Sequence, residues 1–201
     1  MEPFRRIEAI AVPFVETNID TDQIIPARFL NRTRGEGLGN CFFHDLRFGQ
    51  DGGERDEFIL NRAPFRDARV IVAADNFGCG SSREHAVYAA QDFGIRAMIA
   101  PSFGDIFFNN SLKNGLLPIV LNKDAVAALL SDVAARPETG MTVDLESQIV
   151  IGPKGDRHTF TIDAFRKNCL LKGLDEIGFT LELSGEIDAF ERAYKKEFDW
   201  V

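Results

Sequence analysis

Residues 76–86 read Asn-Phe-Gly-Cys-Gly-Ser-Ser-Arg-Glu-His-Ala, and this stretch decides how the chain is organised. The apolar run 69–74 before it predicts a buried strand, and apolar residues at helical spacing after it predict a helix over 82–93. Two glycines, two serines and an arginine therefore occupy a strand-to-helix turn. A helix N-terminus presents unpaired N–H groups and a partial positive charge, so this turn is suited to holding an anion.

The polar side chains of the turn allow two interpretations. Arg83 offers a planar set of donors that matches a carboxylate or a phosphate, and a serine whose alkoxide is stabilised nearby can act as a base. Alternatively, the turn is only a helix cap, since Ser81 and Glu84 have the spacing of a capping box. The local sequence leaves both interpretations open.

Common nucleotide and hydrolase motifs do not match the turn. It has no lysine for a phosphate-binding P-loop, no third glycine for a dinucleotide fingerprint, and no Gly-x-Ser-x-Gly nucleophile elbow. His85, four residues from Ser81 on the same expected helix, points along that helix and not back at the turn. A site for a carboxylate ligand is the functional interpretation that remains.

The composition is that of one globular domain spanning residues 1–201. Of the 201 residues 45% are hydrophobic, which is enough for a substantial core. The 31 acidic and 23 basic residues give a net charge of −8, which disfavours nucleic acid as a partner. No apolar run approaches membrane-spanning length, and the N-terminus lacks the apolar segment of a signal peptide. We therefore expect a soluble, cytoplasmic protein without a membrane partner.

The cysteines and histidines do not predict a metal site on this chain. Cys41, Cys79 and Cys169 are widely spaced, and none forms a C-x-x-C pair. The three histidines are not paired at metal-ligand spacing either. We expect three reduced and mostly buried thiols, and no self-sufficient metal centre.

Alternating elements in the middle of the chain predict a parallel sheet. Strands are expected at 69–74, 97–100 and 116–121, with helices at 82–93, 103–113 and 124–135 between and after them. This rhythm implies parallel pairing through right-handed crossovers. The remaining expected elements are a first strand at 7–15, short antiparallel strands at 143–145, 149–151 and 158–162, and helices at 163–171 and near 186–198.

Two segments are expected to be flexible loops, and one helix carries an apolar stripe. Residues 31–40 contain three glycines among alternating charges, and 50–56 are similarly polar. Loops of this length in a compact domain are often functional. The helix near 186–198 has an apolar stripe on one face, a pattern typical of a core or an interface, and its members are Ile187, Phe190, Tyr194 and Phe198.

The turn at 80–86, Gly-Ser-Ser-Arg-Glu-His-Ala, resembles the signature of the swivelling domain of the aconitase superfamily. The segments 18–26, 100–119 and 161–181 resemble the small subunits of bacterial 3-isopropylmalate dehydratases, also called isopropylmalate isomerases, so the resemblance covers nearly the whole chain. It implies an α/β fold, the swivelling β/β/α domain, with a mostly parallel central sheet flanked by helices and some antiparallel strands.

The resemblance also implies an activity and a partner. Enzymes of this family convert 2-isopropylmalate to 3-isopropylmalate in leucine biosynthesis, removing water to give isopropylmaleate and adding it back in the other sense. The substrate is a small dicarboxylate. A separate large subunit is expected to carry a four-iron four-sulfur cluster and its cysteine ligands, so this chain is expected to be inactive alone and to work in a heterodimer or a higher hetero-oligomer.

Site residues follow from the resemblance position by position. Ser81 matches the serine that removes the substrate proton, and Ser82 and Arg83 match neighbours that bind a substrate carboxylate. Asp22 matches an aspartate of the aconitase Thr-Asp-His-Ile-Ser motif. We expect Asp22 to orient Arg83, because a buried arginine needs a counter-charge.

The chain departs from the aconitase pattern around residues 23–40. Gln23 and Ile25 replace the motif histidine and serine, and the glycine-rich loop 31–40 replaces a segment that carries an arginine for the extra carboxylate of citrate. We expect this loop to close over the isopropyl group, which needs an apolar wall. Arg34 is a candidate contact to a shared carboxylate, and apolar side chains near the loop are Phe29, Leu30 and Leu38.

Two other functions stay open at this point. The chain can be the small subunit of a related hydro-lyase that acts on homoaconitate, methylmalate or citraconate, since these share the Gly-Ser-Ser-Arg turn. It can also be a non-catalytic subunit that binds carboxylates, although the two serines and Arg83 together argue against that function.

Overall fold

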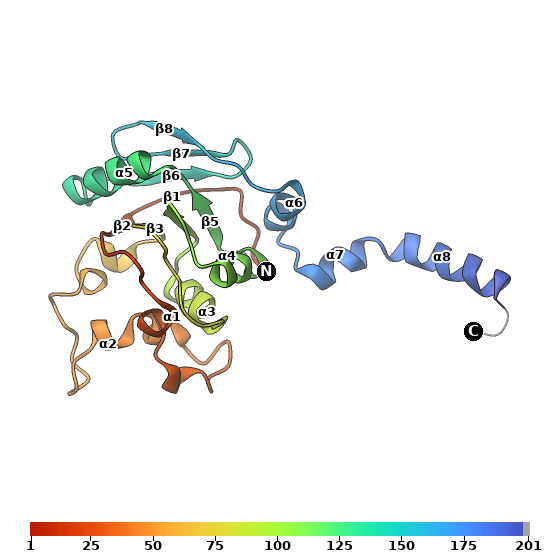
Figure 1. Ribbon diagram of the computed structural model, residues 1–201, viewed down its shortest axis with the longest axis horizontal. Coiled ribbons are helices and arrows are strands. Elements are labelled where there is room, and N and C mark those ends of the chain that lie inside the picture. The colour runs from red at the N-terminus through yellow and green to blue at the C-terminus, as the bar shows by residue number, and fades with distance from the viewer. Residues whose placement is uncertain (199–201) are drawn as a thin grey trace.

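A computed structural model of the chain describes residues 1–198 and shows two sheets in the α/β arrangement that the sequence predicts (Figure 1). In the parallel sheet the strand order is β2-β3-β4-β5, and in the antiparallel sheet it is β1-β6-β7-β8. The parallel strands are β2 (Ala11–Phe14), β3 (Val70–Ala73), β4 (Ala97–Ala100) and β5 (Leu117–Val120). The antiparallel strands are β1 (Arg6–Ala9), β6 (Met141–Asp144), β7 (Ile149–Ile151) and β8 (Arg157–Thr159).

Helices join the strands and extend the chain beyond the second sheet. The expected helices are found as α3 (His85–Phe93), α4 (Asp105–Asn114), α5 (Lys123–Ala135), α6 (Ala164–Lys172) and α8 (Ser184–Glu197). Three further helices are short and were missed by the periodicity, because each has only one or two turns: α1 (Thr21–Ile24), α2 (His44–Arg47) and α7 (Glu176–Glu182). Short 3₁₀ turns lie at Ala27–Phe29, Leu38–Cys41, Ile59–Asn61 and Phe65–Asp67.

The predicted single strand at 7–15 is wrong, because two strands occupy it. β1 pairs antiparallel with β6, whereas β2 pairs parallel with β3 in the other sheet. The change of sheet falls at Ile10, whose carbonyl oxygen accepts hydrogen bonds from the N–H groups of Arg69 and Val70. The first apolar run therefore ties the two sheets together.

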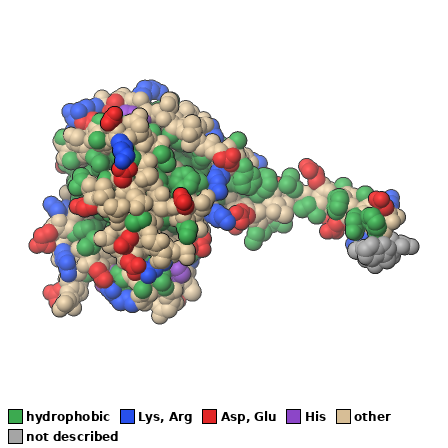
Figure 2. All heavy atoms as spheres, in the orientation of Figure 1, with side chains coloured by type: hydrophobic (Ala, Val, Ile, Leu, Met, Phe, Trp, Pro, Cys, Tyr) green, Lys and Arg blue, Asp and Glu red, His purple; other side chains and the backbone are tan. Residues whose placement is uncertain are grey.

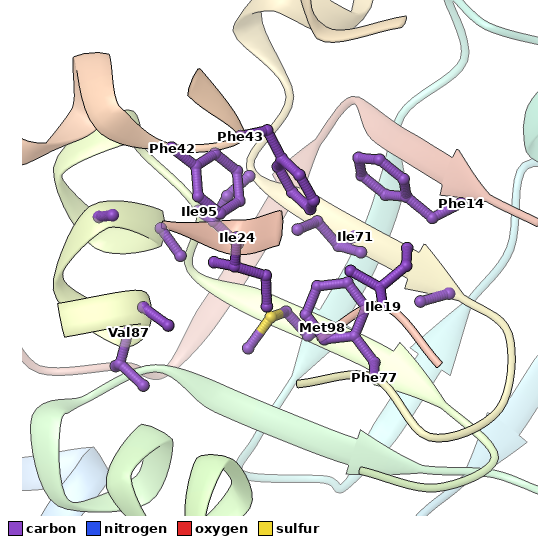
Figure 3. Close-up of a cluster of buried hydrophobic side chains, with 14 of the residues drawn as sticks. Phe14, Ile19, Ile24, Phe42, Phe43, Ile71, Phe77, Val87, Ile95 and Met98 are labelled. Atoms are coloured by element: carbon purple, nitrogen blue, oxygen red, sulfur yellow. The ribbon is translucent and has the colours of Figure 1, made fainter. Parts of the chain in front are cut away.

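The two faces of the parallel sheet bury two hydrophobic clusters. On β3, Ile71 and Ala73 belong to one cluster, and Val70 and Val72 belong to the other, as expected for side chains that alternate across a strand. Figure 3 shows the first cluster, to which segments far apart in the sequence contribute the aromatic rings of Phe14, Phe42, Phe43 and Phe77. Its largest fully buried members include Phe42, Phe43, Phe77, Ile24 and Ile95. This cluster lies beneath the loops that carry the predicted site.

The helices α7 and α8 form an arm that projects from the two sheets (Figure 1). Neither helix has a buried residue. The expected apolar stripe is present but does not enter the core, since Phe190 is 67% exposed and Ile187 is 39% exposed. The described part of the chain, residues 1–198, holds no helix long and apolar enough to cross a membrane.

Candidate active site

The predicted site lies where three loops meet at one edge of the parallel sheet. The loops follow β2, β3 and β4, and the carboxyl ends of parallel strands share an edge where α/β proteins commonly bind ligands. Hydrogen bonds join the loops: the N–H of Gly78 donates to the oxygen of Ile19 at 2.7 Å, and the N–H of Gly104 donates to the oxygen of Phe77 at 2.9 Å. Segments distant in sequence are therefore held together at residues 76–84.

Glycine is required where the loops touch. Gly78 has φ +72°, and a Cβ atom there would lie 2.3 Å from Cγ of Phe107. A Cβ on Gly104 would lie 2.5 Å from the carbonyl oxygen of Gly78. Both contacts are too short for any side chain, so these glycines let the loop approach α4 closely and turn toward Ser81.

The hydroxyl of Ser81 is held by Thr21 from α1. The Thr21 hydroxyl donates to the Ser81 carbonyl oxygen at 3.1 Å, and the two hydroxyl oxygens are 3.3 Å apart. Because Thr21 has one hydroxyl proton and gives it to the carbonyl, the Ser81 hydroxyl can donate to Thr21 Oγ1. Thr21 is buried and Ser81 is exposed, so a fixed group positions an accessible one. The sequence does not single out Thr21, although this residue directly precedes Asp22 in the motif.

Arg83 and Asp22 form an ion pair beside Ser81. An amino group of Arg83 donates to Asp22 and lies 3.5 Å from the carbonyl oxygen of Ile25. The Arg83 side chain is only 17% exposed, whereas that of Asp22 is 58% exposed. The contact that the sequence predicts is therefore present. The Arg83 guanidinium is mostly buried, and the Asp22 carboxylate faces solvent.

The replacement of the motif histidine by Gln23 has a local structural purpose. Asp20 accepts from the N–H of Gln23 at 2.8 Å, and the Gln23 side-chain oxygen accepts from the N–H of Asp20 at 3.0 Å. These reciprocal bonds are a capping box that begins α1. Gln23 thus fixes the short helix that carries Thr21 and Asp22.

The alternative interpretation of Ser81 as part of a capping box is not supported, and the predicted helix start at 82 is wrong. α3 begins at His85, and Glu84 is its N-cap residue without a side-chain cap. The Ser81 hydroxyl contacts Thr21 instead, and the Ser81 carbonyl oxygen accepts from the N–H of Arg83 at 2.8 Å. Glu84 accepts from the side chain of Asn114 at 2.7 Å. Tertiary contacts have replaced the local cap, and they leave residues 81–84 as a turn.

The structure places Ser82 at the same turn but brings Arg34 elsewhere. Ser82 is exposed directly beside Ser81. The Arg34 guanidinium donates to Gln91 at 2.9 Å and lies 4.0 Å above the Tyr88 ring. Both partners of the Arg34 guanidinium are residues of α3 and not of the turn 76–84, so Arg34 is not assembled with Arg83 in this structure. A substrate-binding role for Arg34 stays a prediction.

The loop 31–40 is anchored at its end. Leu38 is fully buried, and its N–H donates to Asp92 at 3.2 Å. Leu38 therefore belongs to the core, and closure of this loop over the substrate stays a prediction. Phe29 and Leu30 are half-buried, and the Phe29 ring packs on His44.

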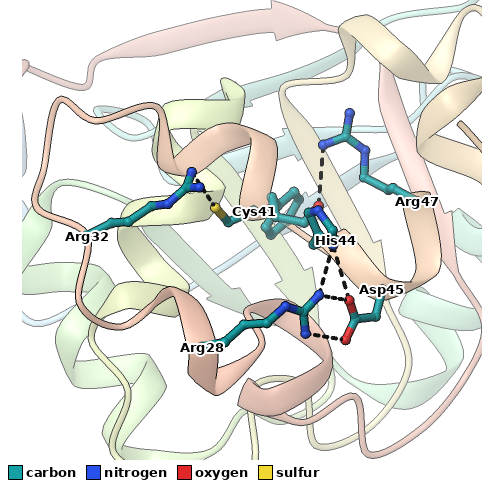
Figure 4. A network of polar contacts seen from close by, with 7 residues as sticks. Arg28, Arg32, Cys41, His44, Asp45 and Arg47 are labelled. Atoms are coloured by element: carbon teal, nitrogen blue, oxygen red, sulfur yellow. Dashed lines mark hydrogen bonds and ion pairs between the residues drawn. The ribbon is translucent and has the colours of Figure 1, made fainter. Parts of the chain in front are cut away.

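Arginines fix the base of this loop (Figure 4). Arg28 binds both carboxylate oxygens of Asp45, which lowers the pKa of that carboxyl to about 2. Arg32 lies 3.4 Å from the sulfur of Cys41, whose burial raises the pKa of the thiol. Arg47 is buried, donates to Asn61 at 3.1 Å and has a pKa lowered by burial.

The cysteines of the described residues do not fit an iron–sulfur cluster. Cys41 ends the 3₁₀ turn Leu38–Cys41, Cys79 lies in the turn 76–84, and Cys169 lies on α6. Burial raises the pKa of each thiol, which opposes the thiolate form that binds metal. Residues 1–198 hold no group of three or more His, Cys, Asp and Glu side chains that could bind a metal ion.

Two protein-family models match the chain. The family described as the aconitase C-terminal domain matches residues 1–124, and a family described as LeuD_N matches residues 127–164. The chain therefore has the fold of the aconitase C-terminal, or swivelling, domain.

The particular family follows from the whole-length relatives. The chain is 51% identical to the 3-isopropylmalate dehydratase small subunit of Rhodospirillum rubrum, over all of this chain and 97% of that protein. It is 52% identical to the one from Gluconacetobacter diazotrophicus, with the same coverage. A crystal structure of 3-isopropylmalate dehydratase (leuD) from Methanocaldococcus jannaschii matches with a TM-score of 0.65 and 27% identity, over 92% of this chain and 99% of that one. The chain belongs to the family of 3-isopropylmalate dehydratase small subunits.

Proposed function

We propose that this chain, joined to a large subunit, converts 2-isopropylmalate to 3-isopropylmalate through isopropylmaleate. Its family makes it a hydro-lyase subunit of leucine biosynthesis, and the names of its relatives imply a large-subunit partner. The observation that carries the proposal is the assembly of Ser81, Arg83 and Asp22 at the carboxyl edge of the parallel sheet. The iron–sulfur cluster is proposed on the large subunit, because the cysteines of this chain do not fit it.

Arg83 binds a carboxylate of the substrate in this proposal. Asp22 engages one amino group of the guanidinium, which leaves other N–H groups free to donate. Arginine–carboxylate bonds are charge-assisted and often bidentate, so the held guanidinium fixes the orientation of the substrate. The exposed hydroxyl of Ser82 supplies another donor to the same carboxylate.

Ser81 removes the proton from the substrate carbon. A serine is a strong base only as its alkoxide, and the positive charge of Arg83 favours that charged form. Thr21 keeps the oxygen at a fixed position, which reduces the entropy cost of reaching the transition state. The same hydroxyl returns a proton when water adds back in the other sense.

Anaerobic reconstitution with the cognate large subunit tests the proposal. The rate of isopropylmaleate formation is followed by its absorbance for wild type, Ser81→Ala and the exposed helical control Ser131→Ala. We expect activity only in the mixture, loss of it in Ser81→Ala, and full activity in the control. A mixture active on another unsaturated diacid instead would reassign the substrate, and an active Ser81→Ala mixture would remove the base role.

A further inference from the structure

The arm carries an exposed apolar surface that its own chain leaves uncovered. On α7, Ile177 is 72% exposed and Leu181 is 66% exposed, and on α8 Phe190 is 67% exposed. Phe190 and Tyr194 stack with their ring centroids 5.7 Å apart. Helices this short are marginally stable in water without packing, so an uncovered apolar face points to a missing partner.

This surface continues onto the two-sheet body. Phe165 at the start of α6 is 46% exposed and meets Phe179 of α7 edge-on, with ring centroids 4.8 Å apart. A hollow of about 390 Å³ lies between α4, β5 and α6, and the half-exposed Val120 lines it. Figure 2 shows hydrophobic side chains gathered along the arm and at its junction with the body.

The outer face of α4 leads from the arm toward the candidate active site: Lys113 pairs with Glu176 of α7 at 2.9 Å, and Asn109 accepts from Arg166 of α6 at 3.0 Å. Ile106 on α4 is 50% exposed and follows Gly104 by two residues. Gly104 is the residue that packs directly against Gly78 in the turn of Ser81. We call this surface the apolar track, and its exposed members are Ile106, Val120, Phe165, Ile177, Leu181, Ile187 and Phe190.

We infer that the apolar track is the docking surface for the large subunit, an inference that rests on the proposed function. A large subunit that completes the site must cover the exposed Ser81 and Ser82, and a surface extended past Ile106 then meets the track. The arm has six acidic and three basic residues over 176–197. The complementary surface on the large subunit is therefore expected to be apolar and bordered by basic residues.

A second copy of this chain is the less suitable occupant. The chain carries a net charge of −8 and its arm is also acidic, so two arms or an arm and a body would bring like charges together. A second copy also brings no new groups to the incomplete site. The charge and the continuity with the Ser81 turn therefore both favour the large subunit.

The affinity of the full chain for the cognate large subunit tests this inference. The variant Ile187→Asp/Phe190→Asp places two charges on the stripe, and we expect affinity to fall at least about 100-fold, since each buried side chain of this size contributes strongly to association. The matched control Ala189→Asp puts the same charge about 200° around the helix from Ile187 and is expected to bind like wild type. Circular dichroism checks that each variant keeps its helices.

The near-site end of the track is tested separately by Ile106→Asp. It lies on the body, so its effect does not depend on the stability of the arm, and we expect at least about 10-fold weaker binding. Wild-type affinity in both variants would overturn the inference, as would dimerisation of this chain through the arm in place of large-subunit binding. Failure of the wild type itself to bind and activate the large subunit would overturn the proposed function as well, which separates the two outcomes.

Discussion

The turn 76–84 and the arm α7–α8 show two ways in which one chain prepares for a partner. The turn is fixed by hydrogen bonds from the loops after β2 and β4 and by glycines in close contact. The arm has an apolar stripe that contacts little of its own chain. Catalytic groups must be preorganised in a fixed geometry, whereas a docking surface needs only the right pattern of exposed side chains.

The strongest test of this comparison separates activity from assembly. Ser81→Ala is expected to lower kcat by about 10²- to 10⁴-fold, the usual contribution of a general base, while its affinity for the large subunit stays unchanged. The arm variant Ile187→Asp/Phe190→Asp is expected to do the reverse, keeping wild-type kcat when the large subunit is in excess. Titrating the large subunit into each variant measures both quantities. A fall in kcat for the arm variant at saturating large subunit would contradict the assignment of catalysis to the turn and assembly to the arm.

A pair of glycine substitutions compares the two regions by stability. Gly78→Ala is expected to cost about 2–4 kcal/mol of unfolding free energy, because its Cβ overlaps Phe107 and its φ is +72°. Gly185→Ala in α8 meets nothing within 4 Å and favours the helix, so the change is expected within about 1 kcal/mol and not destabilising. Urea unfolding followed by circular dichroism gives both values. Equal destabilisation would contradict the rigid-turn interpretation.

Loss of the Asp22 carboxylate is expected to have a moderate effect. In Asp22→Asn, Arg83 loses its counter-charge and its orientation, so KM for the substrate should rise about 10-fold. Because Asp22 is 58% exposed, the ion pair contributes less than about 1 kcal/mol to stability. Steady-state kinetics of the reconstituted enzyme and thermal unfolding check the two statements. Unchanged KM and kcat would remove the positioning role of Asp22.

The smallest expected effect is at the base of the loop 31–40. In Arg28→Met, the pKa of Asp45 should rise from about 2 toward its ordinary value of 3.8, because the guanidinium that binds the carboxylate is gone. A carboxyl whose pKa is depressed by folding stabilises the fold above about pH 4, and this stabilisation is lost as the pH falls from about 4 to 2. The unfolding free energies of wild type and variant should therefore converge in acid. Both side chains are half-exposed, which limits the difference near pH 7 to about 1 kcal/mol. A carboxyl NMR titration measures the pKa directly.

Much of the fold follows from periodicity, and the failures have a common cause. The parallel sheet and its helices were predicted because each element shows its own hydrophobic period. The break at Ile10 was missed because residues 7–15 were treated as one largely apolar run, although β1 alternates charged and apolar residues while β2 is apolar throughout and pairs with a different strand. Likewise, the cap at Ser81 looked local, but Thr21, sixty residues earlier, binds that serine.

One contact within the candidate site was predictable from the sequence, and most of the geometry around it was not. The resemblance placed Asp22 and Arg83 in one site, and the structure joins them in an ion pair. Leu38 was expected near a loop that closes over the substrate, and its burial was not foreseen, because its loop ends in a 3₁₀ turn against α3. A loop rich in glycine carries little local information about which of its apolar side chains enter the core.

The pairing of β1 with β6 has a consequence for the order of folding on the ribosome. Arg6 faces Asp144 across this pair, so the antiparallel sheet cannot form until most of the chain has been synthesised. The parallel sheet is complete once β5 ends at Val120, and by then the Ser81 turn and the loops after β2 and β4 have all emerged. The half of the molecule that holds the candidate catalytic groups can thus assemble first, while β1 stays unpaired until β6 has been translated.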